Sequence, residues 1–256
     1  MTTSDRLKKA VDNIVFSILR GVSLGSDVID EKIFKSEVDP ALMLSFVKFA
    51  AEKMAETFGP TYKRLIIEYA LKFESELLGE RPPETIDDIE QLANYLLSRI
   101  EKHPKSYCAL VYGMSKVDQL LQGGSGTARS VSASVLKKIF EDSGMLNQLI
   151  GSTANPYEAL TKVEELLASI KANMPGEIVL QNLSNGNLRI IIRDCPYVDA
   201  CKRMRSEGLW RPDGTPECYL LTRSTVIAEI ITGKQYDYKV EELTPPERCS
   251  GYVHPI

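Results

Sequence analysis

The sequence predicts an α+β fold, in which an N-terminal helical domain precedes an α+β domain with an antiparallel sheet and a C-terminal cysteine metal site. Over most of the chain before Gly176, apolar residues recur with the period of amphipathic helices. Beyond Gly176 the period shortens to that of strands, around the turn signal Asn185-Gly186. Four of the five cysteines fall in the last quarter of the chain.

The first hundred residues carry the signals of several helices. Charged residues interrupt the apolar ones over residues 5–19, so we expect an amphipathic helix there rather than a signal peptide. Pro40 and Pro60 mark the starts of the next two helices, because proline is favoured at the first helical position. Thr85 resembles the first residue of a capping box for a fourth helix. Short connections predict antiparallel packing, and we assign residues 1–104 to the helical domain.

Residues 105–256 form the predicted α+β domain. We interpret residues 104–126 as a transition whose glycine-rich end, residues 122–127, is a linker rather than a phosphate-binding loop, because it lacks the P-loop Lys-Ser/Thr pair. The remaining predicted elements are helices over residues 129–141 and 156–171, the hairpin strands on either side of Asn185-Gly186, a short helix over 197–206, a helix from Cys218 to Thr232, and strands over 236–243 and 252–256.

Composition narrows the classes of function. The formal net charge is −4 and the isoelectric point is about 5.5, so direct binding to nucleic acid is not expected. No apolar run approaches the roughly 20 residues that a membrane helix needs. Without an export signal we expect a cytoplasmic protein, where cysteines more often bind metals than form structural disulfides. The odd number of cysteines, five, also argues against a complete disulfide framework.

The four late cysteines are the candidate site: Cys195, Cys201, Cys218 and Cys249. Four thiolates close the tetrahedron that Zn²⁺ prefers, and we predict that they share one metal ion. A [4Fe–4S] cluster is the alternative, because a Cys-Pro pair such as the one at Cys195 recurs at cluster ligands. Redox disulfides and unrelated buried thiols stay open as further interpretations. The fifth cysteine, Cys108, sits in an apolar run and is expected in the core.

Other polar residues give weaker signals. The chain has two histidines, and no Ser/His/Asp arrangement can be built from them, so we favour a binding protein over an enzyme and name no catalytic residue. His254 and Glu241 are possible replacements for one cysteine ligand. The basic run over residues 202–205 is interpreted as a solvated helix face.

From about residue 105 onward, the order of features resembles the 4-vinyl reductase, or predicted hydrocarbon-binding, domain family. The resemblance rests on the helices ARSVSASVLKKIFEDSG and NPYEALTKVEELLASI, the hairpin GEIVLQNLSNGNLRIIIRDCPY, the short helix DACKRMRSEGL, and the closing blocks ECYLLTRSTVIAEIITGKQYDYKVEEL and RCSGYVHPI. The family pattern of a cysteine before a helix, a glycine after it, a strand glutamate and a final cysteine corresponds here to Cys218, Gly233, Glu241 and Cys249.

The resemblance implies a sensor or carrier module for small apolar molecules, with a zinc site of cysteines and a glutamate closing over an apolar pocket. It also implies a homodimer, through a distant relation to vesicle-transport-particle subunits. The sequence departs from the family where Thr244 stands in place of a cysteine. Cys195 or Cys201 would then supply the missing thiolate.

The sequence therefore favours a metal-containing protein that binds or senses a small hydrophobic molecule. Two alternatives remain: an iron–sulfur redox protein or reductase component, and a dimeric scaffold or assembly subunit. Helix-face residues that would line the pocket equally describe an ordinary core: Val135, Ile139, Leu160, Val163, Leu167, Val226 and Ile230.

Overall fold

The computed structural model describes residues 27–36, 39–82, 85–121, 126–142, 144, 146–169, 176–195, 197–209, 218–244 and 248–256. The helix expected over residues 5–19 and residues 122–125 of the glycine-rich segment lie outside these ranges. Within them, none of the helices combines the length and the apolar character that a bilayer crossing requires.

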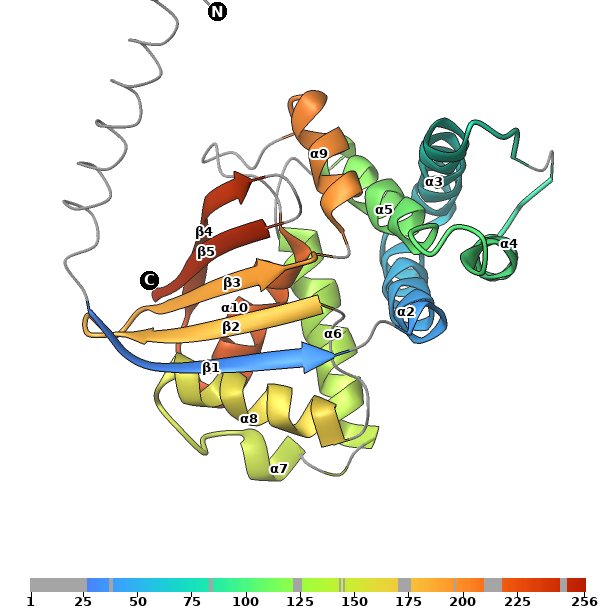
Figure 1. Cartoon of the computed structure of the whole chain (residues 1–256). Coiled ribbons are helices and arrows are strands. Elements are labelled where there is room, and N and C mark those ends of the chain that lie inside the picture. Colours follow the sequence, from blue (N-terminus) through green and yellow to red (C-terminus); the bar gives the residue numbers. More distant parts are fainter. Residues whose placement is uncertain are drawn as a thin grey trace, which may run out of the picture.

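A five-stranded antiparallel sheet organises one side of the molecule (Figure 1). Its strands are β1 (Val28–Ser36), β2 (Gly176–Leu183), β3 (Leu188–Arg193), β4 (Tyr236–Thr244) and β5 (Arg248–Pro255), in the order β1-β2-β3-β5-β4. The hairpin β2–β3 turns at Asn185-Gly186, where Gly186 has a φ of 79°. The predicted α+β class with an antiparallel sheet is confirmed.

One face of the sheet is apolar and packs against helices. Ile178, Ile192 and Cys249 form one cross-strand row on this face. The next row contains Gly251, where a Cβ atom would lie 2.5 Å from Leu221 of helix α10 (Tyr219–Thr232). Because only glycine leaves room for this approach, α10 lies directly over β5. Helix α8 (Pro156–Ser169) covers β2 and β1 on the same face (Figure 1).

A layer of four helices lies beside the sheet in Figure 1. It consists of α2 (Pro40–Phe58), α3 (Pro60–Leu78), α4 (Ile89–Ile100) and α5 (Tyr107–Leu121). Helices α3 and α5 approach closely at Gly113, where a Cβ atom would lie 2.5 Å from the backbone oxygen of Ile66. We refer to these four helices as the helical layer.

Three further helices complete the described chain. Helix α6 (Gly126–Asp142) packs against α10, and the single turn α7 (Leu146–Leu149) follows it. Helix α9 (Val198–Ser206) comes after β3 and packs against α5, so it lies between the end of the sheet and the helical layer (Figure 1).

The structure corrects several sequence predictions. Residues 1–104 were expected to be helical, but β1 lies within them and pairs with β2. Residues 104–126 were expected to be a transition, yet they contain α5, which packs with the helical layer. Segments before residue 104 therefore pack against segments after it, both in the sheet (β1 with β2) and in the helical layer (α3 with α5). Helix α4 is capped by Asp88 rather than Thr85: the Asp88 carboxylate accepts a hydrogen bond from the Gln91 amide at 2.7 Å.

Candidate functional site

The centre of the candidate site is the contact between Cys218 and Cys249. Cys218 is the N-cap residue of α10, as the sequence predicted, and its backbone N–H donates to the Tyr238 hydroxyl at 3.1 Å. Cys249, which precedes the strand expected over 252–256, lies inside β5, opposite Ile192 of β3. The two thiols share a side-chain hydrogen bond, which with burial raises the pKa of Cys249 well above its usual range.

The other two late cysteines approach from β3 and α9. Cys195 follows β3 beyond Asp194, whose φ of 54° turns the chain sharply. Cys201 lies on α9, where its amide donates to the Tyr197 carbonyl at 2.9 Å. Both thiols are near enough to Cys249 to raise the pKa of Cys249 further through electrostatic repulsion between thiolates. Cys218 is thus in contact with Cys249, and Cys195 and Cys201 lie within electrostatic range of it; we call these four residues the cysteine cluster.

Whether the thiols are oxidised to disulfides or arranged as metal ligands decides what the cluster can do chemically. All five cysteines are buried and none forms a disulfide. Among the described residues, no three or more histidine, cysteine, aspartate or glutamate side chains are arranged so that they could hold a metal ion. The four thiols are thus neighbours without standing in a ligand arrangement, and Cys218 and Cys249 are in direct contact.

Two residues considered as replacement ligands lie on the opposite face of the sheet. Glu241 accepts hydrogen bonds from Arg189 at 3.0 Å, from Ser250 at 3.2 Å and from Tyr252 at 3.0 Å. Ser250 and Tyr252 alternate with Cys249 along β5, so their side chains and Glu241 point away from the cluster. His254 has the same parity as Ser250 and faces the same way. The structure therefore leaves thiols as the donors at this site.

Cys108 lies next to the cluster rather than in it. It is fully buried on α5, as predicted, and burial raises the pKa of its thiol, with Asp199 and Cys195 adding to the shift. Tyr107, its neighbour, meets Tyr197 edge to face at a centroid distance of 6.2 Å. Tyr107, Tyr197, Cys108 and Cys195 are thus buried close together between the cluster and the helical layer.

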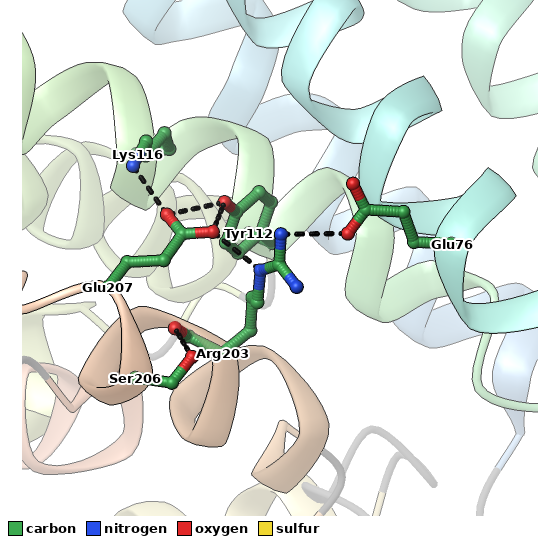
Figure 2. Close-up of polar contacts among 6 residues, drawn as sticks. All are labelled: Glu76, Tyr112, Lys116, Arg203, Ser206 and Glu207. Atoms are coloured by element: carbon green, nitrogen blue, oxygen red, sulfur yellow. Dashed lines mark hydrogen bonds and ion pairs between the residues drawn. The ribbon is translucent and has the colours of Figure 1, made fainter.

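The far end of α9 carries a second polar cluster, centred on Glu207 (Figure 2). The Tyr112 hydroxyl lies 2.8 Å from both carboxylate oxygens of Glu207, which also pairs with Lys116 and Arg203. Burial alone would raise the pKa of Glu207, but the hydrogen bonds from Lys116, Tyr112 and Arg203 outweigh it and lower the pKa to about 2. Arg203 also reaches Glu76 of α3 at 2.8 Å. The basic run that contains Arg203 was expected to be a solvated helix face, and nothing in the sequence singles out Glu207.

The residues expected to line an apolar pocket are core residues where the structure describes them. Leu160, Val163, Leu167 and Val226 are buried in the main apolar cluster, and Ile230 packs against it. The side chains of Val135 and Ile139 lie outside the described part of the chain.

Comparison with known proteins gives few matches. No protein-family model matches the chain, and no curated protein is a significant match. Among solved structures, an Fe(II) unliganded H-NOX protein from K. algicida aligns with 84% of this chain and 96% of its own, at 11% identity and a TM-score of 0.41. A mutant of the T. tengcongensis H-NOX aligns with 83% of this chain and 98% of its own, at 10% identity and a TM-score of 0.34. Scores of this size do not establish a shared fold.

Proposed function

We propose that this protein binds or senses a small hydrophobic molecule, and that a metal ion bound by Cys195, Cys201, Cys218 and Cys249 stabilises its C-terminal half. The supporting observation is that Cys249 is in contact with Cys218 and within electrostatic range of Cys195 and Cys201, and that all four thiols are buried and unbridged. Buried cysteines alone are common. A shared metal would give a reason for their approach from the end of β3, α9, the start of α10 and β5, although all four also belong to the apolar core.

The donor chemistry fits Zn²⁺, with a [4Fe–4S] cluster as the alternative. With Glu241 engaged by Arg189 on the other face of the sheet, the set consists of four sulfurs. Bound metal would supply structural cross-linking between the four segments. No three of these thiols stand in a metal-ligand arrangement in the structure, so binding would require Cys195 and Cys201 to move toward the Cys218–Cys249 pair.

The hydrophobic ligand rests on the resemblance of residues 105–256 to the 4-vinyl reductase domain family. Within that range strands β2 to β5, α8 and α10 enclose an apolar interior beside the cluster. The proposed sensor role of the family and the homodimer share this basis. The ligand part of the proposal is therefore independent of the metal part and is tested separately.

The metal is tested by elemental analysis of the full chain purified without added metal. We expect about one zinc per chain in the wild-type protein and in Cys108→Ser, and strong loss of zinc in Cys249→Ser. Cys108 is the matched control because it is a buried cysteine outside the cluster. Visible absorption and iron in place of zinc would point to the iron–sulfur alternative. A metal-free wild-type protein, or equal loss in both variants, would contradict the metal site.

The ligand is tested by mass spectrometry of organic extracts from the same preparation. A small apolar compound that co-purifies in near-stoichiometric amount supports the binding function. A protein that dimerises tightly but releases no compound supports a scaffold or assembly subunit instead.

A further inference from the structure

Strand β1 forms one edge of the sheet and β4 forms the other (Figure 1). Among the described residues, no strand pairs with the outer side of β1, and an edge of this kind can pair with a strand from another chain. Residues 30–36 pair with β2 in an unbroken register, whereas β4 has a register shift between Val240 and Glu242. Because such irregularities disrupt edge pairing, β1 is the edge better suited to receive another strand.

One face of β1 is already covered by the chain itself. Asp30 accepts a hydrogen bond from the Tyr157 hydroxyl of α8 at 2.8 Å, and Lys32 pairs with Glu165 of α8 at 2.7 Å. Phe34 packs against the core on the same side. Helix α8 therefore occupies the face that these alternate residues share.

The opposite face of β1 carries Glu31, Ile33 and Lys35. Ile33 lies opposite Val179 of β2, and Val179 lies opposite Ile191 of β3. Val179 is 2% exposed and Ile191 is 5% exposed, whereas Ile33 is 52% exposed. An apolar row thus crosses the sheet and ends at its edge with a half-exposed isoleucine.

The charges of β1 are ordered by sign along the strand, with Asp30 and Glu31 before Lys32 and Lys35. An antiparallel copy of the strand therefore brings the acidic half of one chain opposite the basic half of the other. With the two-fold axis at Ile33, this residue lies opposite its own copy, and Glu31 lies opposite the partner's Lys35 on both sides of the axis. An axis at Lys32 would instead place two lysines opposite each other, which is unfavourable.

The contacts that these charges make within the chain are compatible with such pairing. Glu31 accepts a hydrogen bond from Gln181, and Lys35 pairs with Glu177 at 2.9 Å. The Lys35 side chain is 74% exposed, and Glu177 also pairs with Arg193. Glu177 therefore keeps a cationic partner when Lys35 turns toward a second chain.

We propose that β1 pairs antiparallel with β1 of a second copy of this chain, about a two-fold axis at Ile33, so that the two sheets become continuous. The proposal rests on the homodimer part of the proposed function and is independent of the metal and the ligand. Strand β1 lies outside residues 105–256, from which the homodimer was first expected. A single strand pair buries less area than a standard interface, so we expect a reversible dimer with a Kd on the order of 10 µM.

The test is sedimentation velocity of the full chain at concentrations from roughly 1 to 200 µM, a range around the expected Kd. We compare wild type, Glu31→Lys, Lys35→Glu and an equimolar mixture of these two variants. Each variant alone places like charges opposite each other on both sides of the axis. In the mixed dimer both positions again hold opposite charges. The control, Lys239→Glu, makes the same change of charge at an exposed residue of β4.

We expect wild type and Lys239→Glu to dimerise alike, and each β1 variant alone to dimerise at least tenfold more weakly. The equimolar mixture should dimerise about as well as wild type, which also shows that both variants are folded. As a measurement on unaltered protein, amide hydrogen exchange in a peptide covering residues 28–36 should slow as the wild-type concentration rises.

Three results would overturn the pairing. A wild-type protein that stays monomeric over the whole range contradicts the interface and the homodimer together, while the metal and ligand measurements remain separate tests. A dimer that both β1 variants leave unchanged, without slower exchange in residues 28–36, keeps the homodimer but places it on another surface. Weakening of both variants without recovery in the mixture excludes the register centred on Ile33.

Discussion

Cys218 and Tyr238 are joined by a hydrogen bond of 3.1 Å from the backbone amide of the cysteine to the phenol oxygen. The same oxygen lies 3.3 Å from the Thr222 hydroxyl. Tyr238 is buried on β4, so this contact fixes the first turn of α10 against the sheet next to Cys249. The tyrosine thus positions one cluster cysteine relative to another without contributing a sulfur.

Tyr238→Phe should therefore lower the free energy of unfolding by about 1–3 kcal/mol, because a buried amide loses its acceptor. Urea unfolding of metal-free protein measures the change. The control is Tyr252→Phe, which removes a hydroxyl from the other face of the sheet, where Glu241 keeps its Arg189 and Ser250 partners. Equal losses in the two variants would mean that the Tyr238 hydroxyl has no special role at the N-terminus of α10.

The contacts of Glu207 with Lys116, Tyr112 and Arg203 predict a pH dependence of stability. The folded pKa of Glu207, about 2, lies below that of an unfolded glutamate, so the unfolded state takes up the proton first as the pH falls. The stabilisation is complete above about pH 5 and is lost progressively toward pH 2. Glu207 is partly exposed, and after allowance for solvent screening we expect Glu207→Gln to cost about 2 kcal/mol at pH 7.

Urea unfolding of wild type and Glu207→Gln at pH 7 and at pH 3.5 measures this effect. The difference between the two proteins should shrink at the lower pH, because the wild-type protein then loses its own contribution. Glu165→Gln is the control, since the Lys32–Glu165 ion pair is about half exposed on both sides and should be worth less than about 1 kcal/mol. A pH-independent cost at position 207 would contradict the assigned pKa.

Much of the fold followed from local signals, because those signals act over a few residues. Pro40 and Pro60 begin α2 and α3, the Asn185-Gly186 turn joins β2 to β3, and Gly233 ends α10 in the left-handed conformation with a φ of 69°. Each of these positions depends on backbone preferences that one or two residues decide alone. Tertiary packing had no part in them.

The missed elements depended on distant partners. Four of the nine residues of strand β1 are charged. The segment forms a strand only because it pairs with β2, which lies far along the chain. Helix α5 is apolar almost all round, because it is covered by α2, α3 and α9, and so lacks the one-sided pattern that marks an amphipathic helix. Neither neighbour can be seen in a local window.

At the candidate site too, local signals were visible in the sequence and contacts with distant residues were not. The sequence singled out the four cysteines by clustering and predicted Cys218 at a helix start, but it could not show which face of a strand each side chain occupies. A register shift between Val240 and Glu242 helps to set the facing of Glu241 toward Arg189. Glu207 gave no signal because a charged residue just after a short helix is usually solvated. Only the approach of α5 makes it a partly buried acceptor.

The contact between α10 and β5 gives a third prediction, at Gly251. An added Cβ would lie 2.5 Å from Leu221 Cδ1 and 2.6 Å from the Lys239 carbonyl oxygen, and the second atom belongs to the backbone and cannot turn aside. We expect Gly251→Ala to cost about 1–3 kcal/mol of stability. Displacement of α10 should also move Cys218 away from Cys249 and reduce the zinc content.

A double-mutant cycle of Gly251→Ala with Leu221→Ala distinguishes a clash with the leucine side chain from a clash with the Lys239 backbone. If the leucine contributes to the clash, Leu221→Ala should cost less in the Gly251→Ala background than in the wild type, by about 0.5 kcal/mol or more. Strict additivity would mean that the backbone contact alone sets the cost. A stability of Gly251→Ala equal to that of the wild type would show that α10 does not approach β5 as closely as described.

The last prediction concerns an ion pair inside the core, between Glu164 of α8 and Arg223 of α10. Glu164 is 1% exposed and the Arg223 side chain 13%, so both charges have left most of their water. Removal of one partner leaves the other charge buried. We therefore expect Arg223→Met to cost about 3–5 kcal/mol, whereas the double variant Glu164→Leu with Arg223→Met should recover most of that loss. Urea unfolding of the single and double variants measures both. A single-variant cost as small as that of Lys32→Met, at the exposed Lys32–Glu165 pair, would show that the charges at α8 and α10 stay hydrated and that the helices are less tightly apposed.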